Sequence, residues 1–176
     1  MMWARASGFS WLVAILLFQY LTLADTYAVG TSVGCVVKEV LDGDTFKCIP
    51  EQKVHSAKVR DGKVIVRMYG IDAPERSQPY GVEARVYLRR LLKGKRVQLE
   101  VKEVDRYGRL VAVVYDGGRN INLEQVESGH AWAYLRYLDR PYVSQFYSAE
   151  ERAREQRLGL WNQRNPTPPW EWRKSH

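Results

Sequence analysis

The chain has 176 residues, a length that predicts one domain with tails, and 45% of them are hydrophobic, which suffices for a compact core. It carries 27 Lys and Arg against 20 Asp and Glu, a formal charge of +7. This surplus favours a polyanionic partner, such as nucleic acid or an anionic membrane. The sequence has no internal repeat and no low-complexity block, which excludes a repeat array.

Residues 1–24 have the layout of a secretory signal peptide. One positive charge, Arg5, precedes an apolar run at residues 9–23, and small residues that suit cleavage follow at Ala24 and Ala28. A retained membrane anchor is the alternative, because the run is nearly long enough to span a bilayer. We expect cleavage after residue 24 or 28. The mature protein would then be periplasmic or secreted, with no stable membrane association.

Two cysteines, Cys35 and Cys48, flank a predicted hairpin. A bridge between them would suit an oxidising compartment. Two buried free thiols are the alternative, because the sequence does not give the geometry of the pair. Without a nearby histidine the two are poor zinc ligands.

The pattern of the mature chain predicts three strands, a helix, two strands and two more helices. Two β-rich runs surround Asp42-Gly43, a hairpin signal, and Gly62–Ile71 reads as a third strand. Tyr80–Gly94 predicts an amphipathic helix with a basic face. Two strands joined by DRYG follow, then a short helix capped by Asn120 or Asn122. A longer helix lies in VSQFYSAEERAREQRLGLW, with Ser148 as a candidate cap and an earlier start as the alternative.

This order matches an α+β fold, a five-stranded OB-type barrel with about three helices, over residues 31–162. Residues 163–176 contain several prolines and predict an extended tail. OB-type barrels commonly bind nucleic acids or oligosaccharides, but a fold alone does not fix a function.

Four acidic residues fall in two short segments that this topology brings together. Asp42 and Asp44 lie two apart in DGDT, and Asp72 ends the third strand, three residues before Glu75. Since strands two and three are neighbours in a meander, we expect Asp44 and Asp72 to meet at one end of the barrel. Carboxylates in contact repel each other, and Ca²⁺ or Mg²⁺ would relieve the repulsion. For the sequence DGD alone, a simple turn is the alternative.

Two arginines, Arg67 on the third strand and Arg109 on the fifth, complete the candidate site. Arginine has a planar fork of donors that suits phosphate oxygens, so the pair could clamp a phosphodiester. A single arginine on a strand is otherwise a surface residue. Other hydrolytic chemistries lack their motifs, since the chain has no HExxH, no GxxxxGK[ST] and no GxSxG.

On these residues, the chain resembles the staphylococcal nuclease family, also called thermonucleases. The matching segments follow the family's order over about residues 33–162: VLDGDTFKC, VRMYGIDAPE, YGVEAR, DRYGRLVAVVY, NLEQVESGHAWAY and SAEERAREQRLGLW. DGDT alone is a weak motif, but together with R-x4-D-x-P-E and D-x-Y-G-R it becomes specific.

The resemblance implies one bound Ca²⁺ per site. Asp44 and Asp72 match the family's metal-binding aspartates. The backbone carbonyl of Ala73 is a further expected ligand, and it does not depend on the side chain at that position. Asp42 would contact the ion through water.

The resemblance also implies a calcium-dependent endonuclease, a hydrolase of little sequence specificity. Arg67 and Arg109 match phosphate-binding arginines, and Glu75 matches the catalytic glutamate that positions and deprotonates water. Cleavage of the P–O5′ bond would leave 3′-phosphates on DNA, with RNA as a second candidate substrate.

Three further residues are implied to surround the bound nucleotide. Arg106 and Tyr107 match its neighbours, with Arg106 in place of a common lysine. Tyr134 is expected on the aromatic side of the pocket, although AWAYLRY departs from the family pattern and shifts the alignment by a residue. The loop at residues 50–62 is longer than in compact members.

A different class of function, a non-catalytic OB module that binds single strands, is the alternative. It would apply if the acids or arginines were missing, and here all five positions, Asp44, Arg67, Asp72, Glu75 and Arg109, are present. We expect a monomer.

Overall fold

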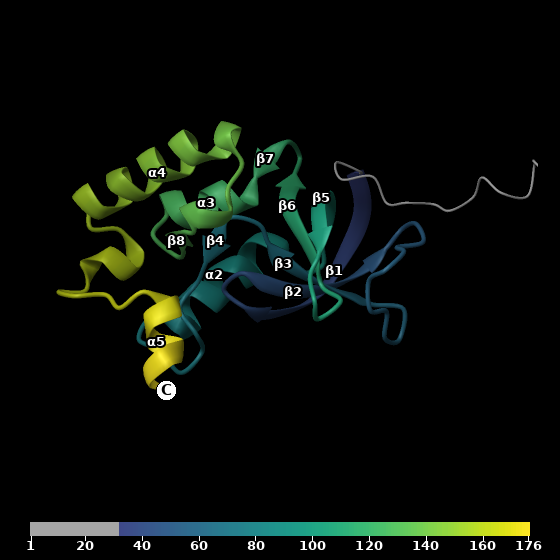
Figure 1. The fold of residues 1–176 in the computed structure, drawn as a ribbon, viewed down its shortest axis with the longest axis horizontal. Coiled ribbons are helices and arrows are strands. Elements are labelled where there is room, and N and C mark those ends of the chain that lie inside the picture. Colours follow the sequence, from purple (N-terminus) through teal and green to yellow (C-terminus); the bar gives the residue numbers. More distant parts are fainter. Residues whose placement is uncertain (1–31) are drawn as a thin grey trace, which may run out of the picture.

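The computed structural model describes residues 32–176 (Figure 1). The predicted signal peptide and its cleavage sites lie outside the described residues. In chain order the elements are β1 (Ser32–Asp42), β2 (Thr45–Pro50), β3 (Val64–Met68), β4 (Ile71–Asp72), α2 (Gly81–Leu92), β5 (Arg96–Val104), β6 (Leu110–Asp116), β7 (Arg119–Asn120), α3 (Ile121–Glu127), β8 (Trp132–Ala133), α4 (Arg140–Glu155) and α5 (Pro169–Ser175). No helix among the described residues is long and apolar enough to cross a bilayer.

Five strands close into a barrel. β1 pairs antiparallel with β2 and with β5, β2 pairs with β3, and β5 pairs with β6. A parallel pairing of β3 with β6 closes the ring. β7 extends the β6 edge, while β4 and β8 form a separate two-stranded sheet. The predicted α+β fold with a five-stranded OB-type barrel is confirmed.

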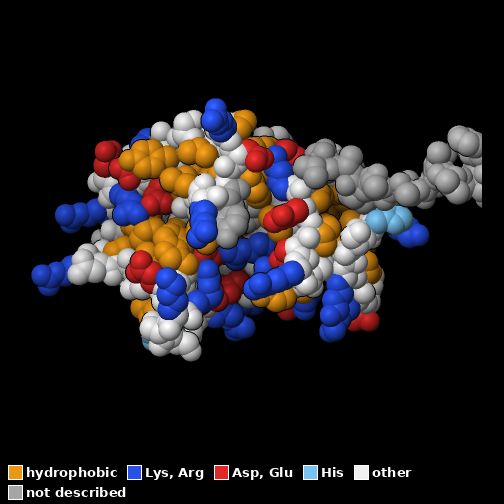
Figure 2. Space-filling view, in the orientation of Figure 1, with side chains coloured by type: hydrophobic (Ala, Val, Ile, Leu, Met, Phe, Trp, Pro, Cys, Tyr) orange, Lys and Arg blue, Asp and Glu red, His pale blue; other side chains and the backbone are white. Residues whose placement is uncertain are grey.

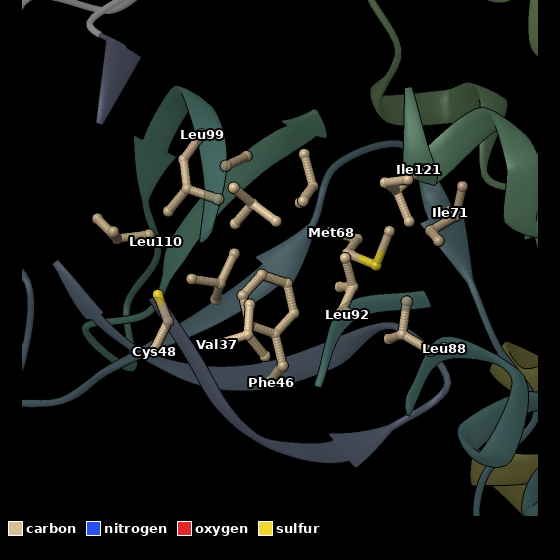
Figure 3. Packing of buried hydrophobic residues seen from close by; sticks show 14 of the residues in the cluster. Val37, Phe46, Cys48, Met68, Ile71, Leu88, Leu92, Leu99, Leu110 and Ile121 are labelled. Carbon is tan, nitrogen blue, oxygen red and sulfur yellow. The ribbon is translucent and has the colours of Figure 1, made fainter. Parts of the chain in front are cut away.

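Along the strands, every second side chain points into the barrel and fills its core. In β3, Val64, Val66 and Met68 are buried, whereas Ile65 and Arg67 point to the other face and are half-buried. Phe46 and Met68 lie among the buried aliphatic side chains of the core, with Leu88 and Leu92 of α2 beside them (Figure 3). Burying a side chain of this size contributes about 1.5–3 kcal/mol, so the core fixes the strand faces, and with them the direction of Arg67.

The helices largely follow the prediction. α2 lies within Tyr80–Gly94, and α3 begins at its predicted cap, because the Asn120 side chain accepts from Leu123 N at 3.0 Å. α4 begins earlier than expected, at Arg140 after Asp139, with Pro141 in its first turn. The predicted cap Ser148 is therefore wrong, since it lies inside α4.

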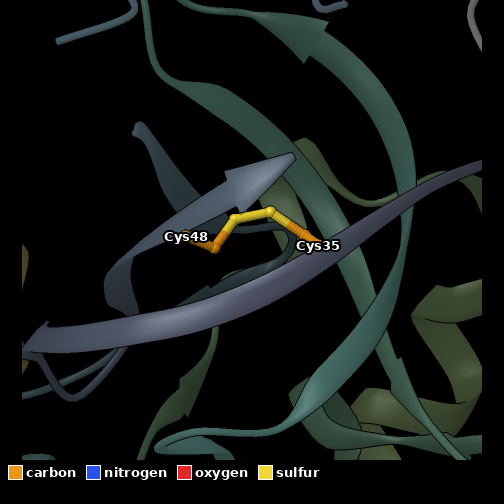
Figure 4. Close-up of a disulfide and its surroundings, with 2 residues drawn as sticks. All are labelled: Cys35 and Cys48. Atoms are coloured by element: carbon orange, nitrogen blue, oxygen red, sulfur yellow. A yellow bond between two sulfur atoms is a disulfide. The ribbon is translucent and has the colours of Figure 1, made fainter. Parts of the chain in front are cut away.

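The two cysteines are bonded. Cys35 of β1 and Cys48 of β2 form a disulfide with a Cα–Cα distance of 5.8 Å (Figure 4). Both side chains are fully buried in the barrel core. The alternative of two free thiols is wrong for this structure.

The C-terminal segment corrects the prediction of an extended tail. Pro168 and Pro169 begin the helix α5, where a missing backbone N–H costs nothing. Trp170 packs on the rings of Trp132 and Tyr134, at centroid distances of 5.6 and 5.3 Å. α5 thereby lies beside the loop between β4 and α2 (Figure 1).

Candidate active site

The DGDT turn between β1 and β2 packs closely against β4 and α2. A Cβ on Gly43 would lie 2.6 Å from Ala73 Cβ and 2.9 Å from Ala84 Cβ, so only glycine fits. The carbonyl of Gly43 accepts a hydrogen bond from Gln125 Nε2 at 2.5 Å. These contacts hold Asp44 next to the end of β4.

Asp44 is buried, with 2% of its surface exposed, and its carboxylate has three partners. Oδ2 accepts from Ala73 N at 2.7 Å, and Oδ1 accepts from Thr45 Oγ1 at 2.8 Å and contacts Arg67 Nη1. Burial raises the pKa of Asp44, and the Arg67 guanidinium opposes that rise.

Arg67 joins the two aspartates that the topology was expected to bring together. Its Nη1 contacts Asp44, and its Nη2 donates to Asp72 Oδ1 at 2.7 Å. Asp72 is fully buried. Burial alone would lower the pKa of Arg67, but the carboxylates of Asp44 and Asp72 raise it overall. The aspartates therefore meet around a guanidinium.

Arg173 of α5 is a site residue that the sequence did not reveal. Nη2 donates to Asp72 Oδ2 at 2.7 Å, and Nη1 donates to Glu75 Oε1 at 2.6 Å and to Asp72 Oδ1 at 3.2 Å. The pKa of Arg173 is raised, and its hydrogen bonds to Asp72 are the largest cause. No local pattern identifies such a residue, because Arg173 lies 101 positions from Asp72 in a segment whose prolines predicted an extended chain.

A cavity of about 460 Å³, here called the active-site cavity, gathers most of the predicted residues. Its lining consists of Leu41, Asp42, Asp44, Thr45, Arg67, Ala73, Glu75, Tyr107, Arg109 and Arg173. Asp72 does not line this cavity, but it is hydrogen-bonded to two residues that do, Arg67 and Arg173. One hollow thus holds acids, arginines and one aromatic ring.

Asp42 shows that negative charge is concentrated here. Burial and the neighbouring Asp44 carboxylate raise the pKa of Asp42 to about 6, and Glu75 adds to the effect. Its Oδ1 accepts from Gly43 N at 2.9 Å, which is a weaker opposing influence. The site therefore favours additional positive charge.

Arg109 is oriented by the turn that precedes it. The carboxylate of Asp105 accepts from Arg109 Nε at 2.7 Å, from Arg109 N at 3.0 Å and from Tyr107 N at 2.9 Å. Burial alone would raise the pKa of Asp105, but these hydrogen bonds lower it overall. The DRYG pattern predicted only a turn at Asp105, because the contact of its carboxylate with Arg109 depends on how the turn folds.

Two predicted nucleotide-binding residues lie outside the active-site cavity. Arg106 Nη2 donates to Tyr107 Oη at 2.7 Å, and Tyr107 is 59% exposed. Tyr134 stacks on Trp170 of α5 and is not among the cavity-lining residues. The structure brings Tyr107 to the cavity, but not Arg106 or Tyr134.

The residues present fit a hard divalent cation. Within residues 32–176, no three His, Cys, Asp or Glu side chains already stand in a metal-binding group. The acids that line the cavity, Asp42, Asp44 and Glu75, nevertheless supply carboxylate oxygens, which are ligands that Ca²⁺ and Mg²⁺ prefer. Burial raises the pKa values of Asp42 and Asp44, and a neighbouring carboxylate raises each further: Asp44 acts on Asp42, and Asp72 acts on Asp44. A cation would lower both pKa values.

Comparison with known proteins agrees with this constellation. Residues 65–163, more than half of the chain, match the family described as "Staphylococcal nuclease homologue". Over 148 residues the chain is 42% identical to "Micrococcal nuclease" of Shigella flexneri, covering 79% of each chain. It is 40% identical to an "Uncharacterized endonuclease" of Haemophilus influenzae, over 80% of this chain and 72% of that one. It is also 40% identical to "Staphylococcal-like nuclease CAN1" of Arabidopsis thaliana, over 64% of this chain and 34% of that longer protein.

The chain belongs to the staphylococcal nuclease family.

Proposed function

We propose that this protein is a calcium-dependent nuclease that hydrolyses phosphodiester bonds of DNA, with RNA as a second candidate substrate, and has little sequence specificity. The observation that carries the proposal is the shared cavity, in which Glu75 lies with Arg67 and Arg109 beside the buried Asp44. Homologues named as nucleases and endonucleases support the same activity.

Arg67 and Arg109 would bind the scissile phosphate. Arg67 is anchored by the carboxylates of Asp44 and Asp72. Arg109 is anchored by the carboxylate of Asp105. Both guanidinium groups are therefore oriented before substrate arrives. As negative charge develops on the phosphoryl oxygens, such fixed donors stabilise the transition state. Loss of one donor of this kind typically costs about 10²–10³ in turnover.

Glu75 would accept the proton of the attacking water. The water oxygen forms a bond to phosphorus, its proton passes to a Glu75 oxygen, and the P–O5′ bond breaks. The O5′ oxygen takes a proton from solvent, so the products are a 3′-phosphate and a 5′-hydroxyl. Tyr107 is exposed at the cavity, under the guanidinium groups of Arg106 and Arg109, and would flank a base of any identity, which is consistent with low sequence specificity. A Ca²⁺ ion held by Asp44, Asp72 and the Ala73 carbonyl, with Asp42 through water, would supply Lewis-acid charge neutralisation.

We also propose that the mature protein is exported and acts as a monomer. The disulfide between Cys35 and Cys48 supports export, because such bonds persist in oxidising compartments. N-terminal sequencing of the mature protein after cell fractionation tests this: a start near residue 25 or 29 in the periplasm or medium is expected. An intact N-terminus in the membrane fraction would contradict it.

Digestion of end-labelled single- and double-stranded DNA and RNA tests the activity. With Ca²⁺ we expect fragments that end in 3′-phosphates, and with excess chelator none. Binding of the same strands without cleavage, under every metal condition, would favour the non-catalytic OB module instead.

A further inference from the structure

A second hollow, here called the basic groove, adjoins the active-site cavity. It has a volume of about 460 Å³, and Tyr107 and Arg109 line both spaces. Its other charged lining residues are Lys47, Lys58, Arg60, Lys63 and a single acid, Asp61. Figure 2 shows Lys and Arg side chains running across this face of the molecule, from α5 towards the β2–β3 loop.

The walls of the basic groove are held in place by backbone contacts. Lys58 N donates to Gly108 O at 2.8 Å, which ties the long β2–β3 loop to the turn that carries Tyr107. A Cβ on Gly108 would lie 2.8 Å from Lys58 Cβ, so glycine permits this approach. Arg60 and Lys63 exchange two backbone hydrogen bonds of 2.9 Å around a tight turn. The groove is therefore formed before any ligand binds.

The charge of the basic groove is only partly compensated, because Arg109 pairs with Asp105 but three other cations of the lining form no ion pair within the described part of the chain. Lys47 pairs with Glu39 at 2.9 Å. Within residues 32–176, Lys58, Arg60 and Lys63 form no ion pair, and Lys58 and Arg60 are exposed. A cationic hollow of this kind attracts a polyanion and releases its counterions.

We propose that the basic groove binds the phosphodiester backbone of a single nucleic-acid strand as it leaves the active-site cavity. The proposal rests on the proposed function, because the shared residues Tyr107 and Arg109 place the groove next to the scissile phosphate. A volume in the usual range for small-ligand pockets, roughly 300–1,000 Å³, admits about one nucleotide. The groove thus makes affinity depend on the length of the strand.

The test compares a long and a short substrate. The variant combines Lys58→Ala, Arg60→Ala and Lys63→Ala, and the control removes three cations from the outer surface of α2 and its C-terminus: Arg89→Ala, Arg90→Ala and Lys93→Ala. For a 20-nucleotide single strand, we expect the groove variant to raise KM at least tenfold. For a dinucleotide, KM and kcat should match wild type, and the control should behave as wild type with both.

Binding without catalysis separates this proposal from the activity. In EDTA, the groove variant should bind a fluorescent 20-nucleotide strand more weakly, and its slope of log Kd against log salt should fall by about 2, or 0.7 per lost contact. That result would uphold the basic groove even if wild type cleaved nothing. Wild-type affinity and salt slope in the variant, or an equal KM change for both substrates, would overturn it.

A different observation concerns Arg173, whose guanidinium holds both Asp72 and Glu75. We infer that the segment at residues 166–176 restrains the site, with Arg173 as an internal counter-ion that a divalent cation must displace. Trp170 and the 2.6 Å hydrogen bond from Gln78 Nε2 to Thr167 O fix the segment over the loop that bears Glu75. A guanidinium on these oxygens occupies them and opposes metal binding.

Calcium titration without nucleic acid tests this inference. Arg173→Ala should bind Ca²⁺ about tenfold more tightly than wild type, the effect of losing charge-assisted hydrogen bonds to a buried carboxylate. Lys174→Ala, an exposed cation in the same helix, removes an equal charge and serves as the control. Calorimetric affinities for Arg173→Ala that equal or fall below those of Lys174→Ala would overturn the inference.

Discussion

The ion pairs of Arg67 give the sharpest prediction about stability. Replacing Arg67 by alanine leaves Asp44 and Asp72, 2% and 0% exposed, without their shared guanidinium. Removing one partner of a buried ion pair costs about 3–5 kcal/mol. Asp72 keeps Arg173, and Asp44 keeps its hydrogen bonds from Ala73 and Thr45. We therefore expect the lower end, a loss of about 3 kcal/mol in the free energy of unfolding.

The sign of the pH dependence follows from Asp44. Burial raises the folded-state pKa of Asp44, and without Arg67 it rises further. Such a group destabilises the fold while it is charged, and the penalty disappears as pH falls through its folded pKa. The difference in unfolding free energy between Arg67→Ala and wild type should thus shrink at acidic pH. The unfolding free energy of Arg67→Lys should lie between those of wild type and Arg67→Ala, because lysine keeps the charge but lacks the planar fork.

Urea unfolding in EDTA, at neutral and acidic pH, measures this effect. The control is Arg96→Ala, which breaks a surface pair with Glu51 whose arginine side chain is 70% exposed. That pair should contribute less than about 1 kcal/mol. If Arg67→Ala lost no more stability than Arg96→Ala, the buried aspartates would not depend on the guanidinium and our description of the site would fail.

Three further predictions concern other parts of the molecule. Replacing both Cys35 and Cys48 by serine should lower the free energy of unfolding by about 3 kcal/mol, because the disulfide joins residues 13 positions apart and closes a short loop. An unchanged urea midpoint would contradict this. Burial lowers the pKa of His130 to about 4, so between pH 6.5 and 4 the unfolded chain binds a proton there that the folded protein does not. The free energy of unfolding of wild type should therefore fall by on the order of 2 kcal/mol over that range. His130→Phe should flatten the profile of unfolding free energy against pH over that range. If the variant and wild type had the same slope, the pH dependence would not come from His130. Asp105→Asn should reduce kcat about tenfold through a misplaced Arg109. Its KM for a dinucleotide and its unfolding midpoint should change little, whereas a change in the midpoint alone would indicate a structural role.

The barrel was predictable because its signals are local. Alternation in β3 fixes which side chains face the core, and Asp42-Gly43 marks the hairpin that makes β2 and β3 neighbours. From these two facts the meeting of Asp44 and Asp72 followed. Their pairing around Arg67 completes the same geometry.

The C-terminal segment was not predictable for a physical reason. Proline favours both an extended chain and the first turn of a helix, and only the packing of Trp170 on Trp132 and Tyr134 decides between them. The role of Arg173 depends on that packing. The same contact explains why Tyr134, expected at the nucleotide, is covered by a neighbouring ring instead.

The disulfide was left open because it depends on register. Cys35 stands opposite Pro50, and Cys48 opposite Val37, so the two cysteines are diagonal neighbours across β1 and β2. A sequence pattern gives the strands but not this offset, which is set by the irregular pairing along β1.

Single-turnover cleavage of a labelled DNA strand tests the central claim most directly. Wild type, Glu75→Gln and the control Glu83→Gln, an exposed glutamate of α2, are compared in saturating Ca²⁺ and in EDTA. We predict that wild type and Glu83→Gln cleave only with Ca²⁺, and that Glu75→Gln binds the strand but cleaves it about 10²-fold or more slowly. Cleavage by Glu75→Gln at the wild-type rate, or cleavage that continues unchanged in EDTA, would contradict a metal-assisted site built around this carboxylate.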